Sequence, residues 1–134
     1  MSSTINNISL VFMMNVNKTK ILFTGDMEKE EEKDLITNGK LSFDILKVPH
    51  HGSSTSLSDE FYQNLNFKEA IISVGYDNKF GHPKEETINK LKPHKCYRTD
   101  LDGQIYIKIY KSSYKIKVNL DIICAKAHFK FIRA

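Results

Sequence analysis

Residues 43–53 pass from an apolar run to a loop with two adjacent histidines, and they read Phe43-Asp44-Ile45-Leu46-Lys47-Val48-Pro49-His50-His51-Gly52-Ser53. The run from Phe43 to Val48 favours a buried strand, and Pro49 ends it. A histidine pair followed by Gly-Ser is uncommon in a loop that only joins two elements. The segment therefore predicts a strand that carries functional side chains at its carboxyl end.

The same order of apolar strand, polar loop and helix occurs on both sides of this segment. Upstream, a strand over Lys20–Thr24 is followed by Gly25-Asp26 and a charged helix over Glu28–Ile36. Downstream, a nearly apolar strand over Glu69–Val74 leads through a polar loop to Gly81-His82-Pro83 and another helix. Repeated strand–helix units predict crossover connections, and therefore an α/β fold with mostly parallel strands.

Other patterns complete the expected elements. An apolar run over Ile8–Val16 predicts a strand, and Ser56 or Ser58 is expected to cap a helix that continues through Leu65. Pro83 is expected in the first turn of the helix that it begins. After Asp102-Gly103, two alternating runs end near Leu120 and predict a C-terminal β-hairpin. We expect a domain over residues 1–120 and an extension over residues 121–134 whose pattern fits either a helix or a strand.

Composition fits one globular domain. The chain has 134 residues, of which 40% are hydrophobic, and no apolar run approaches the roughly 18 residues of a membrane span. We expect no signal peptide at the N-terminus, and the two cysteines form no CxxC pair. These features predict a cytoplasmic protein, with membrane association only through a partner.

Positive charge is concentrated at the C-terminal end, where residues 103–134 carry seven basic side chains and a single acidic one, Asp121. Tyr106, Tyr110 and Tyr114 alternate there with Lys108, Lys111 and Lys115. Charge and aromatic rings together can bind nucleic acid. The alternative is a solvated face of the hairpin, which is the commoner meaning of such a pattern.

Parallel strands would bring several of these loops to one edge of the sheet, where ligands bind in open α/β folds. Asp26, the pair His50 and His51, and His82 are then expected to converge. Carboxylate and imidazole together suit Zn²⁺, Mn²⁺ or iron.

Simpler roles are open for each of these residues. Asp26 could cap the following helix, and His82 could occupy the N-cap position before Pro83. Neighbouring strand residues point to opposite faces, so we expect only one histidine of the pair to be a ligand. Ser53 could cap a helix or could hydrogen-bond a substrate phosphate.

The chain resembles the metallo-β-lactamase superfamily, and within it the hydrolase domain of ComEC-type competence proteins. The resemblance covers roughly residues 6–110 and rests on Asn7-Ile8-Ser9-Leu10-Val11, Leu22-Phe23-Thr24-Gly25-Asp26, residues 44–56 with the His-His-Gly-Ser motif, Ile72-Ser73-Val74-Gly75, Asn78-Lys79-Phe80-Gly81-His82-Pro83, Tyr97-Arg98-Thr99-Asp100 and Asp102-Gly103. It implies a metal-dependent phosphodiesterase or nuclease that acts on DNA, with one or two ions of zinc or manganese in the completed site.

The resemblance also implies a role for each matching residue. Asp26 matches a metal-bridging aspartate. One histidine of the pair matches the last metal ligand, and we assign that role to His51 rather than His50. His50 and His82 are then the catalytic histidines, and His82 and Ser53 are placed to contact the substrate phosphate. Asp100 is expected to orient a histidine.

One part of the family pattern is missing. The superfamily's His-x-His-x-Asp-His motif has no counterpart in the chain, so the resemblance implies only the C-terminal half of an αββα sandwich. Half a sandwich is expected to leave one sheet face uncovered. We therefore expect a complementary N-terminal half or a homodimer, and an inactive chain in isolation. The alternatives are a non-catalytic module that binds nucleic acid or protein, and a truncated remnant.

Overall fold

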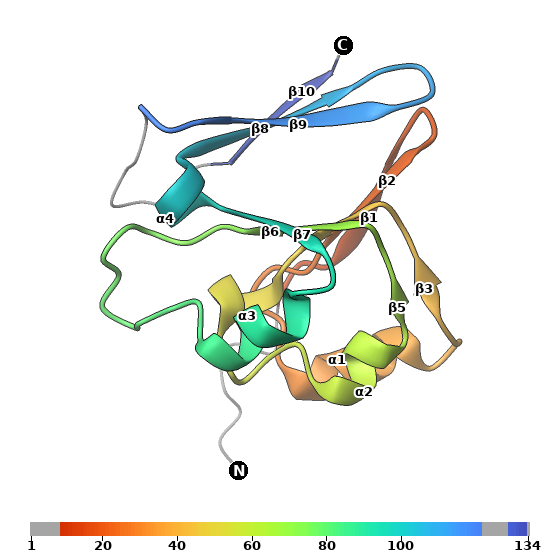
Figure 1. Ribbon diagram of the computed structural model, residues 1–134. Helices are drawn as coiled ribbons and strands as arrows, with labels where there is room; N and C mark the ends of the chain where they lie inside the picture. Colours follow the sequence, from red (N-terminus) through yellow and green to blue (C-terminus); the bar gives the residue numbers. More distant parts are fainter. Residues whose placement is uncertain (1–8, 122–128, 134) are drawn as a thin grey trace.

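The computed structural model describes residues 9–121 and the backbone of residues 129–133 (Figure 1). A five-stranded sheet runs through its middle in the order β1-β2-β4-β6-β7. Its strands are β1 (Phe12–Val16), β2 (Thr19–Phe23), β4 (Ile45–Lys47), β6 (Glu69–Ile72) and β7 (Lys95–Arg98). All neighbours are parallel except β1 and β2. The predicted α/β fold with a mostly parallel sheet is confirmed.

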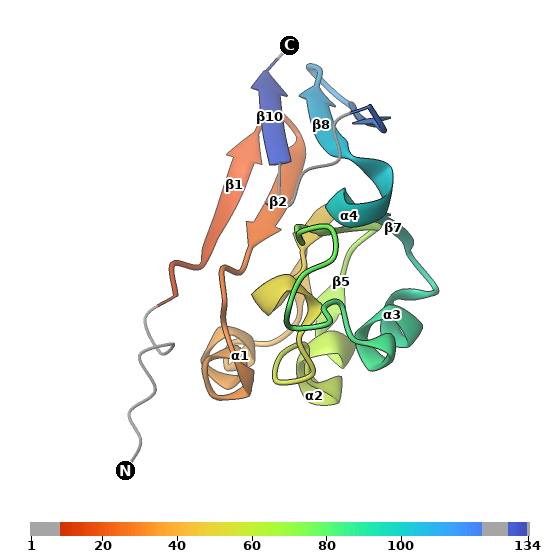
Figure 2. The ribbon, with the colours of Figure 1, turned by 90° about the vertical axis from the view of Figure 1, so that its left-hand side faces the viewer.

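Three helices pack against one face of this sheet, namely α1 (Lys29–Ile36), α2 (Asp59–Gln63) and α3 (Glu85–Leu91) (Figures 1 and 2). Successive strand residues point to opposite faces, so Leu22, Leu46 and Ile72 lie in the core beneath the helices with Phe61 and Leu91. A short parallel pair, β3 (Leu41–Ser42) and β5 (Leu65–Asn66), lies beside this layer.

A second sheet covers the opposite face. The predicted hairpin is confirmed as β8 (Gln104–Ile109) and β9 (Tyr114–Asn119), and a short helix, α4 (Thr99–Asp102), joins β7 to β8. Ile105, Ile107 and Ile109 are fully buried against Ile21, Ile45 and Ile71 of the central sheet, in a second core cluster. The uncovered face that we expected is therefore absent from the described part of the chain, because the chain's own hairpin fills it.

The C-terminal segment contributes a further strand. Residues 129–133 form β10 (Phe129–Arg133), which pairs in parallel with β8, while residues 122–128 and 134 lie outside the described residues. Sequence periodicity could not place this strand, since it pairs across more than a dozen intervening residues.

Two helix boundaries differ from the sequence-based expectation. Ser58 does cap α2 and accepts a hydrogen bond from the Phe61 N–H at 3.2 Å, but the helix ends before Leu65 because that residue pairs in β5. Pro83 precedes α3 rather than starting it, because Lys84 is the N-cap residue and donates its N–H to the Gly52 carbonyl at 2.9 Å.

A buried carboxylate joins α1 to the start of α2. Glu32 is 0% exposed. It accepts hydrogen bonds from the Leu57 N–H, from the Ser58 N–H at 2.9 Å and from the Ser58 hydroxyl at 2.6 Å. In the two described ranges, none of the helices is long and apolar enough to cross a lipid bilayer.

Candidate functional site

The carboxyl ends of β2, β4 and β6 bring the histidine loop and its neighbours together. His51 Nε2 lies 3.4 Å from the Asp26 carboxylate. The ring centroids of His50 and His51 are 6.4 Å apart, and those of His50 and His82 are 6.0 Å apart. Residues far apart in the sequence thus form a single cluster, as the parallel topology predicts.

The backbone of the histidine loop has an unusual conformation. His50 (φ 47°), His51 (φ 55°) and Gly52 (φ 82°) all lie in the left-handed region, which costs energy for residues other than glycine. Such strain persists only where the surroundings enforce it, and it is concentrated at functional sites. The two histidines therefore lie on a turn rather than on a strand, so alternation along a strand does not decide their directions.

Hydrogen bonds from three segments hold this turn. The His50 N–H donates to the Gly25 carbonyl at 3.0 Å, and the Ser53 N–H donates to the His50 carbonyl at 2.9 Å. His51 Nδ1 lies 2.6 Å from the Ser73 carbonyl oxygen, which can only accept, so this nitrogen carries the proton. The other ring nitrogen, Nε2, lies toward Asp26, and a histidine that donates its second N–H to a carbonyl is the arrangement found in metal-ligating histidines.

Asp26 is held through its backbone, while its carboxylate lies beside His51 and remains accessible to solvent. Its N–H donates to the Ser9 hydroxyl at 3.0 Å, and the Asp26 side chain is 52% exposed. The described N-cap of α1 is Glu28 instead, so Asp26 does not cap that helix.

A second carboxylate–histidine pair lies beside the first. His50 Nδ1 is 3.4 Å from Glu28 Oε1 and 3.3 Å from the Thr55 hydroxyl, which in turn donates to Glu28 at 3.1 Å. Neither Glu28 nor Thr55 was predicted as a site residue from the sequence. Glu28 lies two positions after Asp26, and that spacing was the only available signal.

Ser53 is buried and holds the histidine loop through hydrogen bonds to Thr55. Its side chain is buried at 5% exposure, and its hydroxyl lies 3.0 Å from that of Thr55 and accepts the Thr55 N–H at 3.2 Å. Ser53 is the C-cap residue of the 3₁₀ turn over Pro49–Gly52, with its N–H bonded to the His50 carbonyl. Thr55, whose hydroxyl lies 3.3 Å from His50 Nδ1, is exposed.

His82 is fixed by its own loop. The Asn78 side chain accepts the His82 N–H at 2.9 Å and donates to the His82 carbonyl at 2.7 Å. Burial, together with the positive charge of Lys84 and the two other histidines, lowers the pKa of His82 below its ordinary value. The ring is therefore neutral at neutral pH, and its buried Nδ1 has no hydrogen-bond partner among the described residues.

Lys47 lies near the cluster, whereas Asp100 is paired with Arg98. Burial lowers the pKa of Lys47, the last residue of β4, and the nearby Asp26 carboxylate opposes that shift. Asp100 binds Arg98 through both oxygens, at 3.0 and 2.7 Å. No described contact joins Asp100 to a histidine, and its orienting role stays a prediction.

The donors suit a divalent metal in kind, because a carboxylate oxygen and an imidazole nitrogen converge from anchored positions. Their number is smaller than a catalytic zinc site requires, which is usually three protein ligands. In the ranges that the structure covers, no group of three or more His, Cys, Asp or Glu side chains is placed to hold an ion. Among the described residues, Asp26 and His51 alone supply fewer ligands than such a site needs.

Replacing Gly52 with alanine is expected to destabilise the protein by about 2 kcal/mol more than Gly39→Ala. Both glycines have positive φ, but a Cβ on Gly52 would lie 2.5 Å from Pro83 Cβ, whereas a Cβ on Gly39 meets nothing within 4 Å. Urea unfolding of both variants measures the difference. Equal losses would contradict the close contact between the histidine loop and Pro83.

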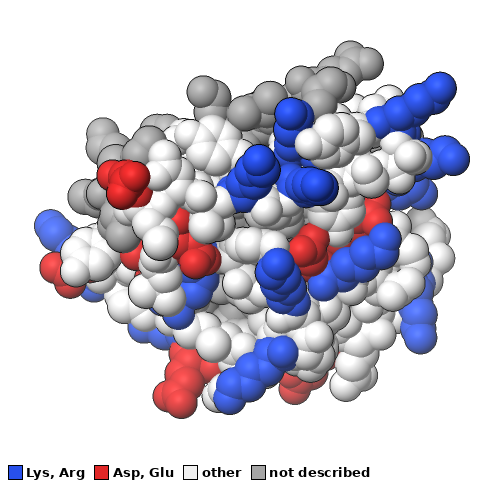
Figure 3. Space-filling view, turned by 45° about the horizontal axis from the view of Figure 1, so that its top comes forward, with Lys and Arg blue, Asp and Glu red and all other residues white. Residues whose placement is uncertain are grey.

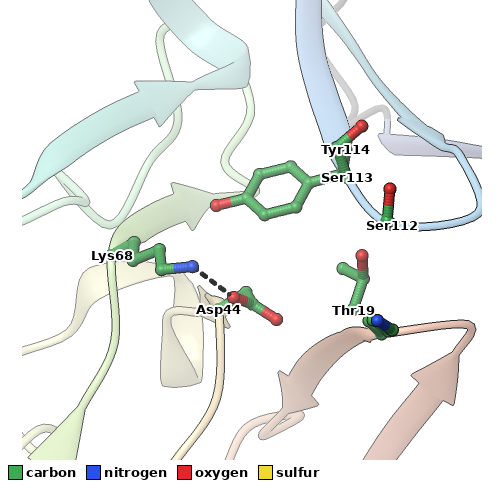
Figure 4. Close-up of a pocket in the computed structure, with 7 residues that line it drawn as sticks. Thr19, Asp44, Lys68, Ser112, Ser113 and Tyr114 are labelled. Atoms are coloured by element: carbon green, nitrogen blue, oxygen red, sulfur yellow. Dashed lines mark hydrogen bonds and ion pairs between the residues drawn. The ribbon is translucent and has the colours of Figure 1, made fainter.

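A separate pocket lies at the opposite edge of the central sheet, where the parallel strands begin (Figure 4). Lys68 forms an ion pair with Asp44 at 2.9 Å, and the Tyr114 side chain points toward them. Asp44 also accepts the Lys20 N–H at 2.9 Å. These bonds lock the strand starts together, so we interpret the pocket as structural.

The outward face of the hairpin is basic. Lys108 lies directly opposite Lys115 across the strands, and Tyr106 lies opposite Lys117. All three lysines are exposed. Lys and Arg side chains gather over the centre and right of the face seen in Figure 3, which views the molecule from the side of this sheet. Like charges directly opposite each other destabilise a sheet, so this pairing favours an anionic partner.

Comparison with known proteins finds homologues among competence and recombination proteins, while no protein-family model matches the chain. The chain is 40% identical over 110 residues to ComE operon protein 3 of Bacillus subtilis, 32% identical over 114 residues to competence protein ComA of Neisseria gonorrhoeae, and 31% identical over 115 residues to recombination protein 2 of Haemophilus influenzae. These matches cover 80%, 82% and 84% of this chain. The chain spans only 14%, 16% and 14% of the three relatives.

Proposed function

From its homology to a segment of competence and recombination proteins, we propose that this chain forms part of a metal-dependent phosphodiester hydrolase that acts on DNA. The relatives' names support a role in competence or recombination. The observation that carries the chemical part of the proposal is the geometry of Asp26 and His51. The metallo-β-lactamase half-fold and the cytoplasmic location stay predictions.

Each side chain of the cluster has its own role in the proposed reaction. Asp26 and His51 Nε2 would supply two of the ligands of a divalent ion, and such an ion would lower the pKa of a bound water and polarise a phosphoryl oxygen. His51 keeps its ligating tautomer because the Ser73 carbonyl accepts the Nδ1 proton. His50 would donate a proton to the leaving oxygen, and Glu28, 3.4 Å from Nδ1, orients its ring. Neutral His82 and Thr55 contact the phosphate.

The remaining ligands come from outside these residues. Asp26 and His51 side chains are 52% and 41% exposed, so the half-site is open to a second body. We propose a complementary half that carries the His-x-His-x-Asp-His motif as the partner, with a second copy of this chain as the alternative. The greater length of the relatives leaves room for such a segment within one protein.

The test is reconstitution of DNA cleavage. The chain alone, a separately produced half with the His-x-His-x-Asp-His motif, and their mixture are incubated with linear DNA and Mn²⁺ or Zn²⁺. We expect cleavage only in the mixture and none after a chelator is added. A mixture that cleaves no faster than either component would reject the proposal.

The basic hairpin face supports a second candidate function, which is metal-independent binding of DNA. Changing Lys108 and Lys115 together to glutamine is expected to reduce the salt dependence of DNA affinity by about two in log–log slope, about one for each lysine that no longer neutralises a phosphate. Fluorescence anisotropy at several salt concentrations measures the slope. Lys29→Gln with Lys33→Gln on α1 is the matched control, and an equal change in both double variants would contradict this function.

A further inference from the structure

We propose that the loop between β6 and α3 carries a stacking site for one unpaired DNA base on the exposed ring of Phe80, so that the substrate is single-stranded where it meets the candidate site. The proposal rests on the proposed function, because it names the substrate class of the same site. Phe80 is 74% exposed. A large aromatic side chain that is this exposed adds little to the packing of the hydrophobic core.

The ring of Phe80 lies beside the ring of His82. The two rings are nearly parallel, with an angle of 14° between planes and 5.8 Å between centroids. His82 therefore lies beside the Phe80 ring in an offset parallel arrangement, and most of the Phe80 side chain stays exposed to solvent. An exposed aromatic ring can stack on the flat surface of a nucleobase regardless of base identity.

Hydrogen bonds hold the backbone of the loop that carries Phe80. Lys84 donates to the Phe80 carbonyl at 2.8 Å, and the Gly81 N–H donates to the Asn78 carbonyl at 3.3 Å. The Asn78 side chain bridges the Gly75 and His82 carbonyls at 3.2 and 2.7 Å. A loop that is ordered in advance loses less conformational entropy on binding.

The Phe80 ring lies close to the histidines of the candidate site. His82 lies between Phe80 and His50, with 5.8 Å to one ring centroid and 6.0 Å to the other. A nucleotide whose phosphate lies against His50 and His51 can place its base on Phe80. The Lys84 ammonium beside the loop adds positive charge for the adjoining phosphate. Duplex bases are stacked on each other and cannot reach the ring without unstacking.

The test measures binding of a fluorescein-labelled, mixed-sequence single-stranded oligonucleotide to the full chain in chelator, so that no cleavage occurs. We expect Phe80→Ala to weaken binding about 10-fold and Phe80→Trp to preserve it. Leu120→Ala, which removes another apolar side chain that is 60% exposed, is expected to change nothing. Circular dichroism confirms that each variant is folded.

An abasic oligonucleotide of equal length separates stacking from charge. We expect Phe80→Ala to leave its affinity, and that of duplex DNA, unchanged. Equal losses on abasic, duplex and single-stranded DNA, or a Phe80→Trp variant as weak as Phe80→Ala, would overturn the stacking site. Because this assay contains no metal, a failed stacking site and a failed hydrolase site give separate results.

Discussion

Replacement of Glu32 by alanine is expected to lower the free energy of unfolding by about 4 kcal/mol. The change leaves the Leu57 and Ser58 N–H groups and the Ser58 hydroxyl without their acceptor. Each buried polar group left unpaired costs about 1–3 kcal/mol. That loss is a large share of the roughly 5–15 kcal/mol that stabilises a domain. Urea denaturation followed by circular dichroism measures it.

Glu30→Ala is the matched control, because Glu30 is an exposed acidic residue in the first turn of the same helix. We expect it to change stability by less than about 0.5 kcal/mol. Glu32→Gln keeps the side-chain shape but leaves one carbonyl oxygen as acceptor, so an intermediate loss is expected. Indistinguishable urea midpoints for Glu32→Ala and Glu30→Ala would contradict a structural role for this carboxylate.

Asp26→Asn and His51→Ala are each expected to reduce DNA cleavage by the reconstituted mixture more than 100-fold. Loss of a residue that only supports a metal ligand costs about 10–100-fold, and loss of the ligand itself should exceed that. Initial rates on linear DNA at saturating Mn²⁺ measure the effect.

Asp34→Asn serves as the control for charge, since Asp34 is an exposed carboxylate near the end of α1. It should cleave at the wild-type rate. If Asp26→Asn and His51→Ala cleave within twofold of wild type, the assignment of both ligands fails, whatever the reconstituted mixture does.

Elements with strong local patterns could be predicted from the sequence. The alternation of Ile105, Ile107 and Ile109 is decisive for β8, because every second residue is buried against the central sheet. Ser58 was predicted as one of two possible caps, and its hydroxyl does accept the Phe61 N–H. Both features leave a local signal in the sequence, an alternation of apolar residues or a capping residue, even where the residues they contact are distant.

Features that depend on distant contacts were not predictable. The second sheet covers a face that we expected to be open, because β8 folds back over β2 and β4 from far along the chain. From the sequence, Glu32 looks like one of several charged residues of a surface helix. Its hydrogen-bond partners, Leu57 and Ser58, lie 25 and 26 positions away. No local pattern distinguishes it from Glu30.

The candidate site also combines features that could be predicted from the sequence with features that could not. Parallel topology alone predicted that Asp26 would meet the histidine loop, and the 3.4 Å separation from His51 agrees. The left-handed turn at His50 and His51 was not foreseen, because it is imposed by hydrogen bonds to the Gly25 and Ser73 carbonyls. The pairing of His50 with Glu28 follows from that turn.

The most direct test is the metal content of the chain itself. Equilibrium dialysis against Mn²⁺ or Zn²⁺ followed by elemental analysis gives the number of ions per chain. We predict one ion per chain at millimolar metal, lost in Asp26→Asn and in His51→Ala but kept in His94→Ala, whose ring stacks on Phe67 with a centroid distance of 3.9 Å. No bound ion, or binding that survives both ligand substitutions, would contradict the central claim.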